Sequence, residues 1–267
     1  MKHKARKRFG QNFLHDAGII HQIVFAISPQ SDDNIVEIGP GKGAITGPIL
    51  EQIGKINVVE LDRDLIPILK ENVATKGELV IHNADAMKYD FSQLSQEAHT
   101  LRVIGNLPYN ISTPLLFHLV NFLPAIKDMH FMLQKEVVDR IVAKPNTKAY
   151  GRLGVMLQYF CHVEKLFIVK PGAFNPAPKV DSAIVRLTPH TNMPVKVSSE
   201  SDLSIIVTQC FSMRRKTLRN NLKELLNDEE IESVNVNPAC RAETLTLNEF
   251  ALLSDTWTHK KSTQASD

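Results

Sequence analysis

Short apolar runs alternate with segments of helical spacing over most of the first 190 residues. Four of these runs, residues 34–38, 56–59, 79–82 and 101–104, are rich in β-branched side chains, which is typical of buried strands. Residues 44–53, between the first two runs, have apolar positions at helical spacing. Alternating strands and helices predict an α/β fold from about residue 31 to 189, with a largely parallel sheet covered by helices on both faces.

The pattern changes near residue 190, where two prolines flank a short polar stretch. Before this point, residues 132–143 predict a helix, and residues 163–169 and 183–187 predict strands of the first domain. After it, residues 203–226 and 247–256 have helical spacing. We therefore expect an α/β domain over residues 1–190 and a small C-terminal helical domain over residues 191–267. The polar stretch after about Thr256 predicts a loose tail.

The first three strands end in side chains that suit a nucleotide-like cofactor. Gly39 and Gly41 lie in a glycine-rich loop that leads into a helix, so the backbone can approach a ligand closely. Glu60 ends the second strand, about 20 residues further on, where nucleotide-binding folds place an acid for ribose hydroxyls. Asp85 and Ala86 follow the third strand, and Asp85 is placed to accept a hydrogen bond from an adenine amino group.

The fourth strand leads through a glycine into Asn106, Leu107, Pro108 and Tyr109. An amide acceptor, a backbone fixed by proline and an aromatic ring are what holding a planar amino group for methylation requires. Each motif alone also suits an ordinary turn, but four successive strand ends with this chemistry are harder to explain as turns. A nicotinamide-dependent dehydrogenase is the competing interpretation, although no site for a hydride acceptor is evident.

The order of these motifs resembles that of class I S-adenosylmethionine-dependent methyltransferases. Longer segments, residues 6–14, 105–114 and 174–182, look like the ribosomal RNA adenine N6,N6-dimethyltransferase family, and above all its bacterial small-subunit branch. The likeness continues through residues 129–137 and 214–220 and covers nearly the whole chain. It implies a seven-stranded Rossmann-like sheet with an antiparallel edge pair. It also implies S-adenosylmethionine-dependent N6,N6-dimethylation of adenines in small-subunit ribosomal RNA, coupled to assembly of that subunit.

The resemblance also implies roles for single residues. The Asn106 side chain and the Leu107 carbonyl would accept hydrogen bonds from the adenine amino group, and Pro108 would stiffen the turn. Tyr109 would stack on the flipped base, with Phe174 facing it from the other side; the structural alternative for Phe174 is a core position held by two prolines. The cofactor contacts would be Asn12, Leu14, Gly39, Gly41, Glu60, Asp85, Ala86 and Asn106.

The charges are informative through their distribution, because the net charge of +2 is too small to indicate a polyanion partner. One basic cluster lies near the N-terminus, and another lies on a predicted helix of the second domain. Either could be a solvated face, but beside a base-methylating site they favour nucleic acid. The predicted RNA contacts are Arg6, Lys7, Arg8, Arg214, Arg215, Lys216 and Arg219.

Several function classes receive no support. No apolar stretch has the length of a signal peptide or membrane span, and the three cysteines lack paired metal-ligand spacing. We expect a metal-free, monomeric, cytoplasmic enzyme whose partner is small-subunit ribosomal RNA within an immature subunit. A DNA adenine methyltransferase, a large-subunit RNA dimethyltransferase and an assembly factor whose binding matters more than methylation stay open.

Overall fold

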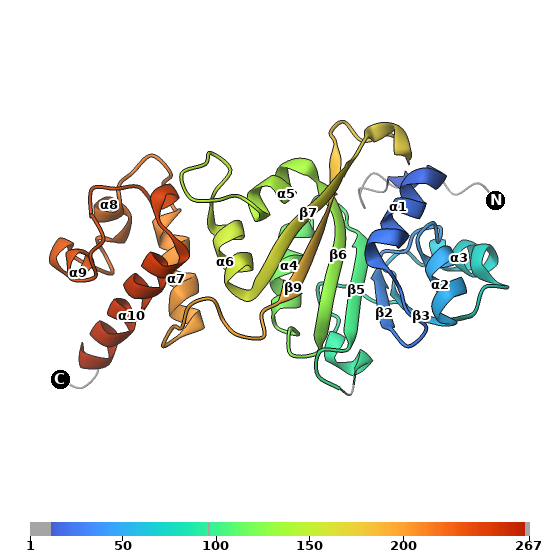
Figure 1. Cartoon of the computed structure of the whole chain (residues 1–267), viewed down its shortest axis with the longest axis horizontal. Coiled ribbons are helices and arrows are strands. Elements are labelled where there is room, and N and C mark those ends of the chain that lie inside the picture. Colours follow the sequence, from blue (N-terminus) through green and yellow to red (C-terminus); the bar gives the residue numbers. More distant parts are fainter. Residues whose placement is uncertain (1–11, 96, 265–267) are drawn as a thin grey trace. The chain divides into compact units, whose positions relative to one another are not determined.

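The computed structural model describes residues 12–95 and 97–264 (Figure 1). These residues form two compact units, one of residues 12–138 and 163–189 and the other of residues 139–162 and 190–264. The sequence-based division at residue 190 differs from these units in one segment. Residues 139–162 group with the C-terminal helices, because their helix packs against the first helix of the following segment.

The first unit is built on a seven-stranded sheet in the order β4-β3-β2-β5-β6-β9-β7. The strands β4, β3, β2, β5 and β6 run parallel, and β9 runs antiparallel to β6. The predicted seven-stranded α/β sheet is confirmed. Its strands are β2 (Asn34–Ile38), β3 (Lys55–Val59), β4 (Glu78–His82), β5 (Leu101–Asn106), β6 (Ile126–Gln134), β7 (Cys161–Val169) and β9 (Ser182–Pro189).

Three helices cover one face of this sheet. Alternate strand residues such as Ile35, Ile56 and Ile104 form one buried cluster with apolar side chains of α1, α2 and α3, because successive strand side chains point to opposite faces. A two-stranded ribbon, β1 (Phe13–Leu14) paired antiparallel with β8 (Phe174–Asn175), joins the same cluster. The helices that begin in this unit are α1 (Ala17–Ile27), α2 (Thr46–Ile53), α3 (Leu65–Val73), α4 (Ser112–Val120) and α5 (Lys135–Ile141).

The β5–β6 region differs from the sequence predictions in two details. The helix predicted over residues 132–143 begins only at Lys135, because Met132 to Gln134 pair with β9 and extend the strand. Gly105 lies inside β5, where a Cβ atom would come within 2.6 Å of the Ile38 carbonyl oxygen of the neighbouring strand. Glycine is therefore needed there for the close approach of β2 and β5.

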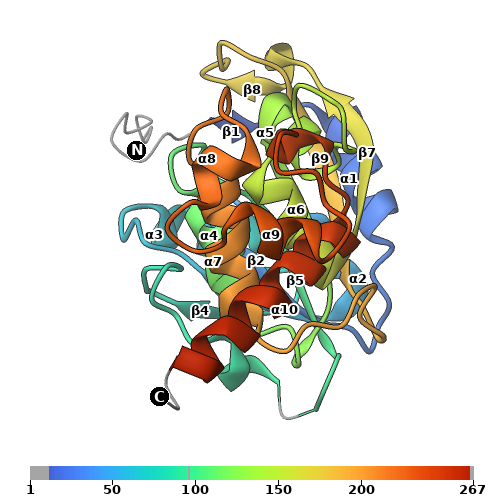
Figure 2. The ribbon, with the colours of Figure 1, turned by 90° about the vertical axis from the view of Figure 1, so that its left-hand side faces the viewer.

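The second unit contains α6 (Arg152–Phe160), α7 (Glu200–Cys210), α8 (Leu218–Leu222), α9 (Asp228–Glu232) and α10 (Leu247–Gln264), and α10 packs along α7 (Figure 2). The continuous helix predicted over residues 203–226 is wrong, because residues 211–217 form a connection between α7 and α8. The buried Asn221 side chain donates a hydrogen bond of 2.6 Å to the Cys210 carbonyl and so satisfies the end of α7.

The C-terminal segment is helical where the sequence predicted a loose tail. Helix α10 continues from Thr256 to Gln264. Thr258 donates a hydrogen bond of 2.7 Å to Asp202 of α7, and Lys261 forms a 2.5 Å ion pair with the same carboxylate. The tail prediction is therefore wrong as far as Gln264, because contacts with α7 fix a segment whose own composition is polar.

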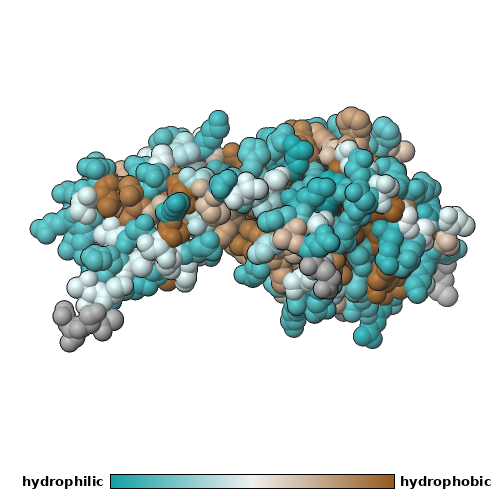
Figure 3. Space-filling model, turned by 60° about the horizontal axis from the view of Figure 1, so that its bottom comes forward, coloured by the Kyte–Doolittle hydropathy of each residue, from teal (hydrophilic) through white to brown (hydrophobic). Residues whose placement is uncertain are grey.

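The surface is mostly polar on the face that Figure 3 displays, with hydrophobic residues in smaller groups. Among residues 12–95 and 97–264, no helix has both the length and the apolar character that crossing a bilayer requires.

Candidate active site

A cavity of about 330 Å³ lies beyond the carboxyl ends of the four neighbouring strands β4, β3, β2 and β5. In open α/β sheets this edge is where ligands bind. The structure places every predicted cofactor contact in its wall, together with Leu107, Pro108 and Tyr109. These cofactor contacts are Asn12, Leu14, Gly39, Gly41, Glu60, Asp85, Ala86 and Asn106.

Glu60 ties the end of β3 to the glycine loop. Its Oε1 atom accepts a hydrogen bond of 2.8 Å from the Asp62 amide, and its Oε2 atom accepts one of 3.3 Å from the Gly41 amide. Gly41 has a φ of 59°, which glycine adopts without strain. Burial raises the pKa of Glu60, while the amides of Asp62 and Gly41 oppose that shift. Each carboxylate oxygen keeps a further acceptor site for a ligand hydroxyl.

Glu37 is a cavity residue that the sequence analysis missed. It is 2% exposed and accepts a hydrogen bond of 2.6 Å from the Thr46 hydroxyl. Burial raises the pKa of Glu37 to about 7; the Thr46 hydroxyl opposes this shift, and the negative charge of Glu60 adds to it. A carboxylate between the apolar residues Val36 and Ile38 was the available signal, because such a group is costly to bury without a partner.

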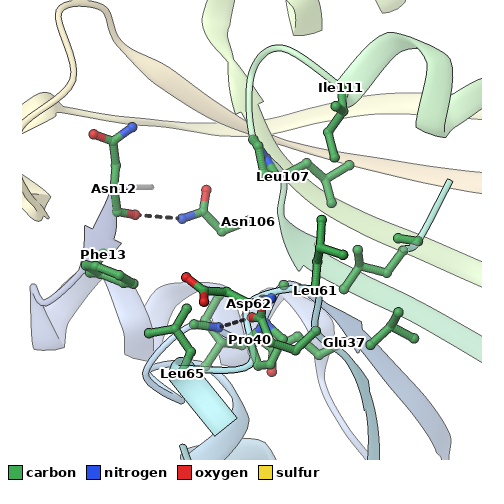
Figure 4. Close-up of a pocket in the computed structure, with 18 of the residues that line it drawn as sticks. Asn12, Phe13, Glu37, Pro40, Leu61, Asp62, Leu65, Asn106, Leu107 and Ile111 are labelled. Carbon is green, nitrogen blue, oxygen red and sulfur yellow. Dashed lines mark hydrogen bonds between the residues drawn. The ribbon is translucent and has the colours of Figure 1, made fainter. Parts of the chain in front are cut away.

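The turn after β5 has a defined set of hydrogen bonds. The Asn106 Nδ2 atom donates to the Asn12 carbonyl oxygen at 3.1 Å, and Figure 4 shows the amide pointing toward Asn12. The Leu107 amide donates to the Met132 carbonyl at 3.2 Å. No described residue donates a hydrogen bond to the Asn106 Oδ1 atom or the Leu107 carbonyl. Two acceptors without a described donor therefore belong to residues in the wall of the cavity.

Tyr109 lines the cavity and is held through its hydroxyl. The hydroxyl lies 2.8 Å from the Oγ atom of Ser182, which is 1% exposed at the start of β9. Burial raises the pKa of Tyr109, while the hydrogen bond with Ser182 opposes the shift. The phenol is therefore a neutral group at physiological pH, and its ring forms part of the wall.

Phe174 departs from its prediction. It does not line the cavity; it lies opposite Leu14 in the β1–β8 ribbon and is 3% exposed within the hydrophobic cluster. The structure thus favours the structural alternative, a core phenylalanine, because pairing of β8 with β1 turns this side chain into the interior. This arrangement therefore gives no support to the prediction that the Phe174 ring faces Tyr109 across the target base.

The parts of the cavity wall that follow β3 and β4 combine polar and apolar groups. The Asp85 Oδ1 atom accepts a hydrogen bond of 3.0 Å from the Met87 amide, which leaves Oδ2 for other donors. Leu61 also lines the cavity and is 51% exposed. Leu61 was not predicted from the sequence, because an apolar residue between two acids carries no signal of a ligand contact.

The comparison with known families decides what kind of protein this is. A model of the ribosomal RNA adenine dimethylase family matches residues 2–258. The chain belongs to the ribosomal RNA adenine dimethylase family. The family predicted from the motifs is confirmed.

Relatives of this dimethylase resemble it over nearly its whole length. It is 56% identical over 253 residues to the ribosomal RNA small subunit methyltransferase A of Hahella chejuensis, which covers 95% of this chain and 93% of that protein. It is 57% identical over 253 residues to the protein of the same name from Acinetobacter baylyi, covering 95% of this chain and 92% of that protein.

Solved structures agree on the fold. A dimethyladenosine transferase from Plasmodium falciparum superposes with a TM-score of 0.80 at 27% identity, covering 93% of this chain and 98% of that one. The 23S rRNA methyltransferase ErmE has a TM-score of 0.72 at 22% identity, covering 92% of this chain and 100% of that one, and shows the shared fold alone. The predicted class I methyltransferase fold is confirmed.

The predicted RNA contacts of this dimethylase divide into three sets. Arg6, Lys7 and Arg8 lie outside the described residues. Arg214, Arg215 and Lys216 are exposed in the α7–α8 connection rather than on a helix, whereas Arg219 is exposed on α8 and forms a 2.6 Å ion pair with Asp228.

Within the described part of the chain, no group of three or more acidic, histidine or cysteine side chains is arranged to hold a metal.

Proposed function

We propose that this chain transfers methyl groups from S-adenosylmethionine to the N6 atoms of adenines in small-subunit ribosomal RNA and produces N6,N6-dimethyladenine. Family membership supports the reaction class. The observation that carries the assignment of the site is the pair of acceptors without a described donor, the Asn106 Oδ1 atom and the Leu107 carbonyl, which belong to residues in the wall of a cavity of about 330 Å³. Two acceptors match the two N–H bonds of an exocyclic amino group.

The residues of the cavity fit the proposed cofactor. Glu60 would bind the ribose hydroxyls, the free oxygen of Asp85 would accept from the adenine amino group, and Leu61 would cover the purine ring. The buried Glu37 carboxylate favours a cationic part of the ligand. When bound, S-adenosylmethionine supplies an electrophilic methyl group on positively charged sulfur. Asn12, Leu14, Gly39, Gly41 and Ala86 complete the proposed contacts.

The proposed mechanism follows from the electronic structure of adenine. The N6 lone pair is delocalised into the ring, so N6 is a poor nucleophile. Asn106 and Leu107 would accept hydrogen bonds from both N–H groups and so localise the lone pair toward the methyl donor. Pro108 has no N–H group and fixes the turn, and the Tyr109 ring would stack on the flipped base. Water takes up the released proton, and no side chain is assigned as a general base.

The wider setting is also proposed. We place the enzyme in the cytoplasm as a monomer that acts on ribosomal RNA within an immature small subunit. The predicted basic residues would neutralise phosphates, since most protein contacts to structured RNA involve the backbone rather than base sequence. These residues are Arg6, Lys7, Arg8, Arg215, Lys216 and Arg219; Arg214 of the predicted set donates a hydrogen bond to a backbone carbonyl instead.

The test is methyl transfer from labelled cofactor to naked small-subunit RNA, immature small subunits, mature small subunits and large-subunit RNA, with the modified nucleoside identified. We expect dimethyladenosine in small-subunit RNA, with immature subunits as the best substrate. Transfer only to large-subunit RNA would favour the large-subunit enzyme, and transfer to none of them would refute the proposal.

Asn106→Ala separates the site from the general fold. Transfer should fall by about 10²–10³, as for loss of one preorganised polar group, while cofactor binding persists. Asn121→Ala is the matched control, because Asn121 is exposed at the end of α4, and its transfer rate should equal that of the parent. A folded Asn106→Ala variant with the parent rate would show that the catalytic turn is misassigned. The same inactive variant, tested for growth, separates methylation from an assembly role.

A further inference from the structure

The connection between α5 and α6, residues 142–151, is an ordered turn in the second unit. The Thr147 hydroxyl donates a hydrogen bond of 2.7 Å to the Lys144 carbonyl, and Asn146 has a φ of 67°. The Gln158 side chain donates to the Ala143 carbonyl at 2.9 Å. These contacts use backbone groups, so the turn is fixed while its lysine side chains stay exposed.

Two further contacts join this turn to segments far along the chain. Arg214, in the α7–α8 connection, donates a hydrogen bond of 2.6 Å from Nη2 to the Lys148 carbonyl. The Asn146 amide donates one of 2.7 Å to the Glu243 carbonyl. The α5–α6 turn and the α7–α8 connection therefore lie side by side at one end of the second unit, as Figure 1 also shows.

The joined segments carry charge of one sign. Residues 142–151 and 211–219 contain six basic residues and no aspartate or glutamate. Four of the six, Lys144, Lys148, Arg215 and Lys216, are exposed and form no ion pair with any described residue. Arg214 instead binds the Lys148 carbonyl, and its guanidinium lies 3.9 Å from the Glu243 carboxylate.

We propose that Lys144 and Lys148 form one phosphate-binding surface together with Arg215 and Lys216, and that Arg214 is a positioning residue that holds the two halves together. The surface fits the sugar–phosphate backbone of RNA. When its unpaired cations neutralise phosphates, the counterions condensed on the RNA are released, and this release favours binding. This inference rests on the proposed function, which supplies RNA as the substrate. It adds the α5–α6 turn, which the basic clusters of the sequence did not include.

The test is the salt dependence of binding to a small-subunit ribosomal RNA transcript. The double variant Lys144→Gln with Lys148→Gln should weaken binding and reduce the slope of log K against log salt by about 0.7–0.9 for each phosphate that is no longer neutralised. The control removes the same charge from the first unit through Lys55→Gln with Lys70→Gln, both exposed and the first in a 2.7 Å ion pair with Glu78, and should leave the slope unchanged. Circular dichroism checks the fold of each variant.

Arg214→Gln distinguishes positioning from direct contact. The triple variant combines Arg214→Gln with the two lysine changes. If Arg214 acts through the turn, the slope lost in the triple variant should be smaller than the sum of the slopes lost in Arg214→Gln and in the lysine double variant. Full additivity would overturn the positioning role, and a folded lysine double variant with the parent slope would overturn the surface. If the parent bound no ribosomal RNA at any salt concentration, the proposed function would fail as well, whereas a parent that binds and methylates RNA confines the failure to this surface.

Discussion

Replacing Glu37 with glutamine should stabilise the ligand-free protein more at high pH than at low pH. Burial raises the pKa of Glu37 to about 7 from the ordinary value of 4.5, so the folded state keeps a proton that the unfolded chain has already released. Stability contributed by this residue therefore falls as the pH rises from about 4.5 to about 7 and stays constant above that range. Glutamine keeps an acceptor for Thr46 and does not ionise.

The magnitude follows from the two pKa values. The raised pKa of Glu37 lowers the free energy of unfolding by about 3 kcal/mol once the pH is well above 7, and by about 1 kcal/mol near pH 5.5. The advantage of Glu37→Gln over the parent should therefore grow by about 2 kcal/mol between about pH 5.5 and pH 8.5. The hydrogen bond with Thr46 remains in both proteins, so it largely cancels from this difference.

Urea unfolding at the two pH values, followed by circular dichroism, measures this change in the free energy of unfolding. Glu71→Gln is the matched control, because Glu71 is exposed on α3, and its effect should be the same at both pH values. Carboxyl-carbon NMR of Glu37 gives a second readout. Equal effects of Glu37→Gln at both pH values, together with titration of the carboxyl near 4.5, would refute the argument from burial.

Three further predictions follow from single contacts. Glu60→Ala should weaken cofactor binding by about 1.5–3 kcal/mol, the value of hydrogen bonds to a charged group, while calorimetry detects no change in RNA affinity; an unchanged cofactor affinity would remove Glu60 from the site. Tyr109→Phe should lose the hydrogen bond with Ser182, worth about 1 kcal/mol of stability, and keep most single-turnover methylation, whereas Tyr109→Ala should lose about 1–3 kcal/mol of base stacking; equal rates for the two variants would argue against stacking. The buried Arg102 of β5 forms ion pairs with Asp33 and Asp128. Arg102→Gln should destabilise the fold by about 3–5 kcal/mol, because both carboxylates lose their buried guanidinium. A variant whose thermal unfolding midpoint equals that of the parent would contradict this.

The sequence was sufficient for the parallel strands and for many of the residues in the wall of the cavity, although not for Glu37 or Leu61. Strand and helix periodicity identified the parallel strands, and the carboxyl ends of neighbouring parallel strands meet at one edge. Side chains such as Glu60, Asp85 and Asn106 could therefore be assigned to one site without knowledge of any contact between them. Local chemistry and topology carried this part of the prediction.

Only the tertiary structure decided how particular side chains are used. Pairing of β8 with β1 buried Phe174, and the surrounding elements raised the pKa of Glu37. A contact between residues 66 positions apart engaged Arg214 with the Lys148 carbonyl. Such outcomes depend on which elements meet in space, and the periodicity of one segment reports only whether its own faces are apolar. The sequence therefore determined the framework and the chemistry available at its edge, and long-range packing determined which groups remain free to act.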